Sequence, residues 1–97
     1  MRVKVGNIEM VFLPHGGTIA YIPITKKELE FVKDAERKSI FGKIPYEFNK
    51  WLRRKLARVR RRFPERFEDL MEASFWVRES VDKKGRRKYT LVIDTGD

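Results

Sequence analysis

The spacing of apolar residues changes twice along this chain of 97 residues, and that change constrains the fold more than any other feature. Near the amino end, Ile8, Met10 and Phe12 recur at every second position, which is the period of a strand with one buried face. Between residues 26 and 71 the period becomes helical, and from Ser74 it returns to two. A chain of this length builds one core, so we expect a single α+β domain over residues 1–97 with a mainly antiparallel sheet.

Strands are expected at both ends of the chain. Residues 2–24 predict a three-stranded meander or a curled hairpin, because Gly6-Asn7 can form a tight turn and residues 14–17 (Pro-His-Gly-Gly) break the chain again. Residues 74–93 predict a hairpin with its tip at residues 82–88. Six residues are expected to point to the same face of this hairpin: Phe75, Val77, Val81, Tyr89, Leu91 and Ile93.

Two to three helices are expected between these strands. Thr25 and Glu28 fit a capping box, in which each side chain bonds the backbone amide of the other residue. The first helix is therefore expected to begin near residue 26. It should continue to about residue 41, where Gly42 would end it as a left-handed cap.

The second expected helix carries the most functional information. Pro45 suits its first position, because the missing amide hydrogen would have no partner there. The helix should continue to about residue 63, and a short third helix should follow from about residue 65 to residue 71. Five apolar residues at helical spacing form a narrow core stripe: Phe48, Leu52, Leu56, Val59 and Phe63.

The opposite face of the second helix carries only positive charge. Eight basic residues fill it: Lys50, Arg53, Arg54, Lys55, Arg58, Arg60, Arg61 and Arg62. No acidic residue lies between Phe48 and Phe63, so the helix lacks the Glu–Lys pairs that would each stabilise it by about 0.2 to 0.5 kcal/mol. Such a surface predicts a polyanionic partner. The alternative is a structural role: arginines at the end of a helix complement its dipole, and Glu65, Glu68 or Asp69 could fold back and neutralise part of the cluster.

A second basic site is expected at the hairpin tip, around Gly85. Lysines at a tip also protect a sheet edge from pairing, so a purely structural role is the alternative there. A basic helix followed by a hairpin with a basic tip is the arrangement of a winged-helix reader of nucleic acid. The nucleic-acid-binding residues predicted from the two sites are Lys50, Arg53, Arg54, Arg58, Arg61, Arg62, Lys83, Lys84, Arg86, Arg87 and Lys88.

The overall charge also indicates a polyanion. The chain has 23 basic and 14 acidic residues, and the resulting net charge of +9 opposes folding by self-repulsion. The absence of Cys and Gln suggests a thermophile, which explains many charges but not the excess of one sign. Duplex DNA is the favoured partner. RNA is the other nucleic acid considered, because Trp51 and Trp76 could stack on unpaired bases, although each fits a half-buried core position.

The same composition excludes several classes of protein. The absence of cysteine rules out disulfides and thiolate zinc sites and fits a cytoplasmic protein. We expect no signal peptide, no membrane partner, no metal and no cofactor. Three alternatives stay open: docking of an acidic protein partner, formation of a homodimer, and a small toxin-type ribonuclease. The ribonuclease would use four residues if the fold gathers them: His15, Arg86, Lys88 and Tyr89.

Six short segments carry a resemblance to a known family: 41–43 (Phe-Gly-Lys), 49–62, 62–67, 74–77, 84–86 and 89–91. In this order they make residues 40–97 similar to the amino-terminal DNA-binding domains of phage and archaeal-virus regulators, the Rha and antirepressor (KilA-N-like) group. The resemblance implies a viral, plasmid-type or archaeal transcriptional regulator. It also implies that such a regulator binds DNA through the basic helix.

Overall fold

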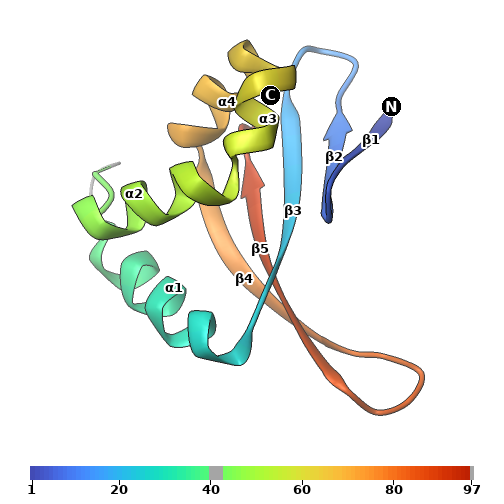
Figure 1. Ribbon diagram of the computed structural model, residues 1–97, viewed down its shortest axis with the longest axis vertical. Coiled ribbons are helices and arrows are strands. Elements are labelled where there is room, and N and C mark those ends of the chain that lie inside the picture. Colours follow the sequence, from blue (N-terminus) through green and yellow to red (C-terminus); the bar gives the residue numbers. More distant parts are fainter. Residues whose placement is uncertain (40–42, 97) are drawn as a thin grey trace.

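The computed structural model describes residues 1–39 and 43–96. Within these ranges the elements are β1 (Arg2–Val5), β2 (Ile8–Phe12), β3 (Thr18–Ile24), α1 (Lys26–Lys38), α2 (Tyr46–Lys55), α3 (Ala57–Arg62), α4 (Pro64–Met71), β4 (Ser74–Val81) and β5 (Arg87–Asp94). The strands form one antiparallel sheet in the order β1-β2-β3-β5-β4. Figure 1 shows the helices together on one side of this sheet. The predicted α+β class, the meander and the carboxyl-terminal hairpin are confirmed.

The meander forms where the sequence changes direction. Gly6 in the β1–β2 turn has a φ of 63°, which a residue with a side chain rarely adopts. Ile8 and Met10 are buried toward the helices and Phe12 is half-buried on the same face, as their period of two predicts. β3 then pairs with β5, which joins the meander to the hairpin in one sheet.

α1 begins at the predicted capping box. The Thr25 hydroxyl accepts a hydrogen bond from the Glu28 amide at 3.2 Å, and the Glu28 carboxylate accepts one from the Thr25 amide at 2.9 Å. The helix ends at Lys38, so the predicted end near residue 41 is wrong. Ser39 leaves the helical conformation, and its hydroxyl donates to the Ala35 carbonyl at 2.8 Å. The predicted cap at Gly42 lies outside the described residues.

The second predicted helix is two helices rather than one. Leu56 has φ −96° and ψ 13°, which separates α2 from α3. The bend keeps the apolar stripe against a twisted sheet, since Leu52, Leu56 and Val59 are all buried. Pro45 is the N-cap residue rather than the first helical residue. The four helices of the described residues therefore exceed the two to three that were expected.

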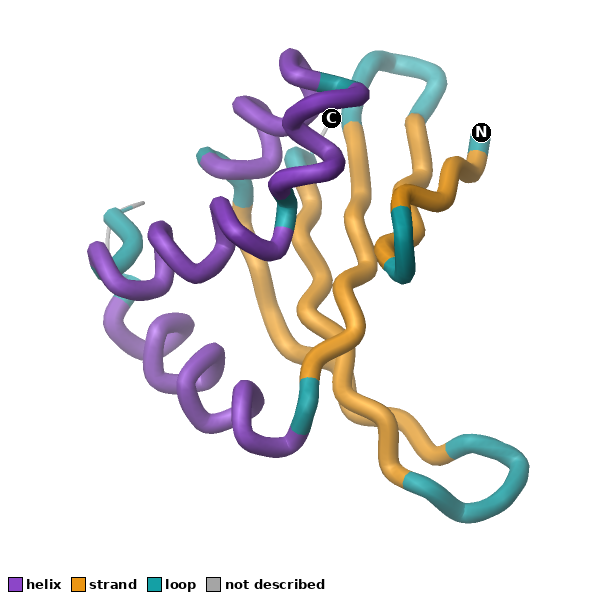
Figure 2. The backbone as a smooth tube through the Cα atoms, viewed as in Figure 1, coloured by secondary structure: helices purple, strands orange, loops and turns teal. Residues whose placement is uncertain are grey.

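The core lies between the helices and one face of the sheet. Phe48 of α2 is 1% exposed, and its ring stacks on that of Phe75 in β4 with the centroids 4.6 Å apart. The register places the six predicted hairpin residues on one face, as expected; Leu91 and Ile93 are buried there, whereas Val81, near the tip, is 66% exposed. Figure 2 shows the cause, because β4 and β5 continue beyond the other strands and leave the core.

Candidate nucleic-acid interface

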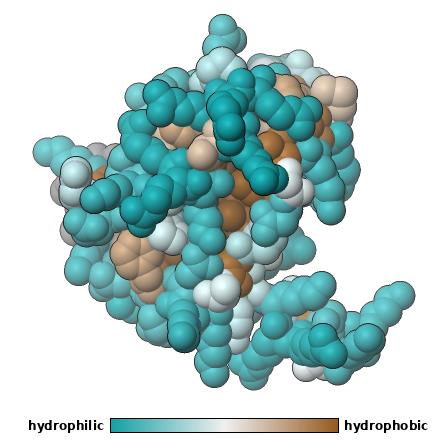
Figure 3. Space-filling model, in the orientation of Figure 1, coloured by the Kyte–Doolittle hydropathy of each residue, from teal (hydrophilic) through white to brown (hydrophobic). Residues whose placement is uncertain are grey.

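The outward surface of α2 and α3, which we call the helical basic surface, holds the predicted helix residues. All six are exposed: Lys50, Arg53, Arg54, Arg58, Arg61 and Arg62. Figure 3 shows hydrophilic side chains covering the region of these helices. Among residues 1–39 and 43–96, none of the six has a carboxylate within 4.0 Å. In this part of the chain, neither Glu65, Glu68 nor Asp69 forms an ion pair with any of the six, so neutralisation by these carboxylates has no support there.

Some arginines of this surface lie against the protein. The guanidinium groups of Arg53 and Arg60 lie 5.7 and 5.6 Å from the ring centroid of Phe67, which is buried. Arg62 donates a hydrogen bond to the carbonyl of Lys4 at 3.4 Å and so contacts β1. Packing of this kind limits the conformations of a long side chain, which lowers the entropy lost when it binds a ligand.

Arg54, Arg58 and Arg61 lie at the rim of a hollow between α2, α3 and the β1–β2 turn. The hollow has a volume of about 390 Å³ and is lined by Val5, Gly6, Asn7, Ile8, Arg54, Lys55, Ala57, Arg58 and Arg61. A Cβ placed on Gly6 would lie 3.2 Å from Nη1 of Arg58. The glycine therefore permits this close approach of helix and turn. Three guanidinium groups around one concave surface can bind phosphate oxygens with paired hydrogen bonds.

Lys55 is set apart from these residues because its charge is already paired. Its Nζ lies 2.7 Å from Oε2 of Glu28, and Trp51 Nε1 donates to the same oxygen at 3.2 Å. Burial raises the pKa of the Glu28 carboxyl, but the hydrogen bonds from Lys55, the Thr25 amide and Trp51 outweigh burial. Together with the Lys55 charge they hold the pKa below its ordinary value of 4.5. Trp51 is thus half-buried, as its position predicts, and links α1 to α2.

This arrangement predicts an acid-sensitive contribution to stability. Because the folded-state pKa of Glu28 is lowered, its stabilisation is complete above about pH 4.5 and is lost as the pH falls through the lower folded-state value. We expect Glu28→Gln to be less stable than wild type at pH 7, with the difference shrinking below pH 4.5. Urea unfolding between pH 7 and pH 2.5 measures the difference. Glu36→Gln, at an exposed carboxylate of the same helix, is the control, and an equal pH response in both variants would contradict the assignment.

The hairpin tip holds the second predicted set on a well-formed turn. The Asp82 carboxylate accepts hydrogen bonds from the amides of Lys84 and Arg86, both at 2.9 Å, and Gly85 has a φ of 80°. The five basic residues of the tip are exposed, and none has a carboxylate within 4.0 Å in the described ranges: Lys83, Lys84, Arg86, Arg87 and Lys88.

The two predicted basic sites lie far apart on the molecule. Figures 1 and 2 show the hairpin tip at the opposite end from α3 and α4. α4 also separates α3 from β4 along the chain. The winged-helix-like arrangement, in which a helix and a hairpin flank the same groove, is therefore not confirmed. The hairpin tip and the helical basic surface are therefore two separate basic surfaces.

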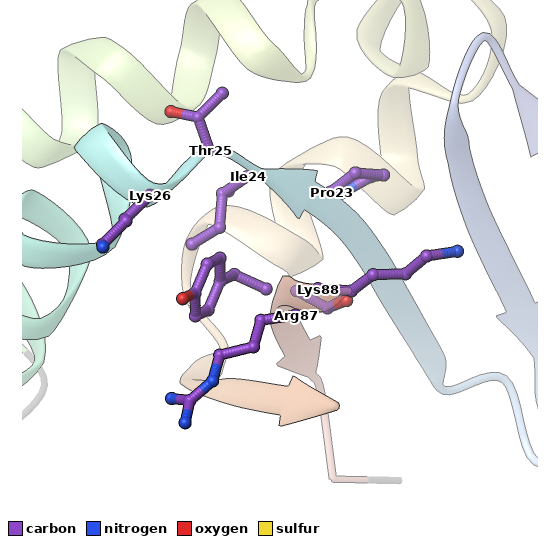
Figure 4. Close-up of a pocket in the computed structure, with 8 residues that line it drawn as sticks. Pro23, Ile24, Thr25, Lys26, Arg87 and Lys88 are labelled. Carbon is purple, nitrogen blue, oxygen red and sulfur yellow. The ribbon is translucent and has the colours of Figure 1, made fainter. Parts of the chain in front are cut away.

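A larger hollow lies where the hairpin leaves the sheet. It has a volume of about 710 Å³ and is lined by Pro23, Ile24, Thr25, Lys26, Arg87, Lys88, Tyr89 and Thr90. Figure 4 shows the side chains of Arg87 and Lys88 extending in opposite directions from β5, as alternation along a strand requires. The cations at this hollow therefore do not converge on one point, and we assign it no ligand.

The four residues considered for ribonuclease chemistry are not all gathered, because His15 lies far from the hairpin that holds Arg86, Lys88 and Tyr89. His15 lies in the β2–β3 loop, whose Gly16 carbonyl accepts a hydrogen bond from Arg66 of α4 at 3.1 Å. Tyr89 and Lys88 lie in the hairpin, at the other end of the sheet (Figure 1). In the described ranges, no three acidic or histidine side chains lie close enough to hold one metal ion.

Comparisons with protein-family models, curated protein sequences and solved structures found no match to this chain. None of the helices in the described ranges combines the length and the hydrophobicity needed to cross a membrane.

Proposed function

We propose that this protein binds nucleic acid, with duplex DNA as the favoured form, through the helical basic surface. The observation that carries the proposal is the exposure of its six basic side chains without a carboxylate within 4.0 Å in residues 1–39 and 43–96. Such a surface is electrostatically unfavourable alone and becomes favourable beside a row of phosphates. Five of the six residues are arginine, whose planar guanidinium binds phosphate with two hydrogen bonds at once.

Two further features support the proposal. The chain carries a net charge of +9, and the hollow beside the β1–β2 turn offers a concave surface lined by Arg54, Arg58 and Arg61. The resemblance of residues 40–97 to the DNA-binding domains of viral regulators extends the proposal to a transcriptional regulator. The lack of cysteine fits action in the cytoplasm.

A salt titration tests the proposal directly. The affinity for a fluorescent duplex of about 20 base pairs should fall with salt at a log–log slope of about −4 to −6, as expected for roughly five to seven contacted phosphates. Fluorescence anisotropy measures this slope. Polyglutamate of similar charge is the competitor, because it offers carboxylates without phosphates. A slope near zero would overturn the proposal, and stronger binding of polyglutamate would favour an acidic protein as the partner.

A further inference from the structure

The face of the sheet opposite the helices has no role in the proposed binding of duplex DNA. The register places Tyr21, Val92 and Trp76 side by side across β3, β5 and β4, and partners of this kind point to the same face. With strands about 4.8 Å apart, the backbones of Tyr21 and Trp76 lie roughly 10 Å from one another. Trp76 is 41% exposed. In the part of the chain that the structure describes, no helix covers this face (Figure 1).

A hollow on this open face is built by every strand of the sheet. It has a volume of about 280 Å³ and is lined by Arg2 of β1, Glu9 of β2, Tyr21 of β3, Thr90 of β5 and Arg78 of β4. Register places all five of these residues on the face that carries Trp76. Figure 3 shows the molecule indented between its main body and the projecting hairpin, on the side away from α1 and α2.

The charges at this hollow are not balanced. Arg2 and Glu9 form an ion pair, which holds the Arg2 guanidinium over the sheet. Arg78 is exposed and has no carboxylate within 4.0 Å in the described ranges. A ligand here therefore meets the unpaired Arg78, the ion pair of Arg2 with Glu9, and the ring of Tyr21.

This combination of aromatic rings and arginines favours unpaired nucleotides over a duplex or a second copy of the chain. Aromatic rings beside arginines bind unpaired nucleotides, because the rings stack on the bases and the cations contact the phosphates. A duplex keeps its base faces stacked inside and offers the rings nothing to contact. A second copy of the chain is a poor occupant, because each copy carries a net charge of +9.

We infer that the open face of the sheet binds a single-stranded segment of nucleic acid. Trp76 and Tyr21 stack on its bases, while Arg78 and Arg2 contact its phosphates. This site lies on the opposite side of the sheet from the helical basic surface, so it is a second function that does not depend on duplex binding.

The test uses tryptophan emission and the full chain. Trp51→Phe leaves Trp76 as the only tryptophan, and a ten-nucleotide oligouridylate should quench its emission on binding. Trp76→Ala should weaken binding of the labelled oligonucleotide by roughly 5- to 150-fold, the effect of losing one base stack. Affinity for the duplex should stay at the wild-type value. Arg78→Gln is a second variant, at an exposed residue outside the core, and its affinity for the same oligonucleotide should also fall.

Each outcome of this test is decisive. If Trp76→Ala and Arg78→Gln bind the oligonucleotide as wild type does, the inference is wrong even where duplex binding is confirmed. If both variants lose the oligonucleotide and wild type binds no duplex, the inference holds and the proposed function fails. If sedimentation shows a dimer in which Trp76 is shielded without nucleic acid, the open face is a dimer interface and the inference is overturned.

Discussion

Replacing Arg54, Arg58 and Arg61 with glutamine is expected to lower the affinity for duplex DNA by roughly 100- to 1,000-fold at about 0.1 M salt. The three guanidinium groups line one hollow, and each lost phosphate contact makes the salt slope shallower by about 0.9. The fold should be unchanged, because exposed substitutions usually cost less than about 0.5 kcal/mol each. Anisotropy titrations at several salt concentrations and a thermal melt measure both quantities.

A matched variant separates a local surface from a general effect of charge. Lys26, Lys27 and Lys43 are exposed, lie outside the helical basic surface and have no carboxylate within 4.0 Å in the described ranges, so replacing them with glutamine removes the same charge elsewhere on the molecule. This variant should bind the duplex within a few-fold of wild type. An equal loss in both variants would mean that net charge, and not the helical basic surface, drives binding. Wild-type binding by the first variant with a lower melting temperature would show that its arginines stabilise the fold.

Phe48→Ala is expected to have the largest effect on stability. The ring is 1% exposed, stacks on Phe75, and lies 5.6 Å from the ring of Trp51. Removing a buried phenylalanine ring typically costs about 3 to 5 kcal/mol, which is a large part of the roughly 5 to 15 kcal/mol that holds a domain folded. Urea unfolding measures the loss.

Phe31 provides the control for this substitution. Its ring centroid lies 6.1 Å from that of Phe48, but the residue is 37% exposed. Phe31→Ala should therefore cost clearly less than Phe48→Ala, because less apolar area returns to water. Equal losses would show that the aromatic cluster is not centred on Phe48.

The strands and the core could be predicted from sequence. An element with one buried face has apolar residues at every second position in a strand and about every 3.6 residues in a helix. The break at Leu56 could not, since neither Gly nor Pro marks it and Leu52, Leu56 and Val59 fit one continuous helix equally well. The exposure of Val81 also depends on where the helices stop covering the hairpin. That limit is set by packing and not by the local sequence.

The exposed arginines of α2 and α3 were predictable, because their positions follow from the core stripe. The separation of the two basic sites was not, since it depends on the strand order and on how far β4 and β5 extend beyond the other strands. The open-face hollow was missed for a related reason. It combines one residue from each of five strands, and only the register of the sheet brings these residues together. The one signal in the sequence is the alternation within β3, where Ile19 and Tyr21 point away from the face of the buried Ala20 and Ile22.

The pairing of β3 with β5 has a consequence for the synthesis of the protein. Residues 18–24 form the middle of the sheet only with residues 89–94, so the ribosome must make most of the chain before the central ladder can close. Until then β3 presents an unpaired edge, which is a site for aggregation. Contacts this distant in sequence also slow folding, because the loop between them must close first. The nascent chain therefore carries this edge of β3 unpaired until residues 89–94 have been made.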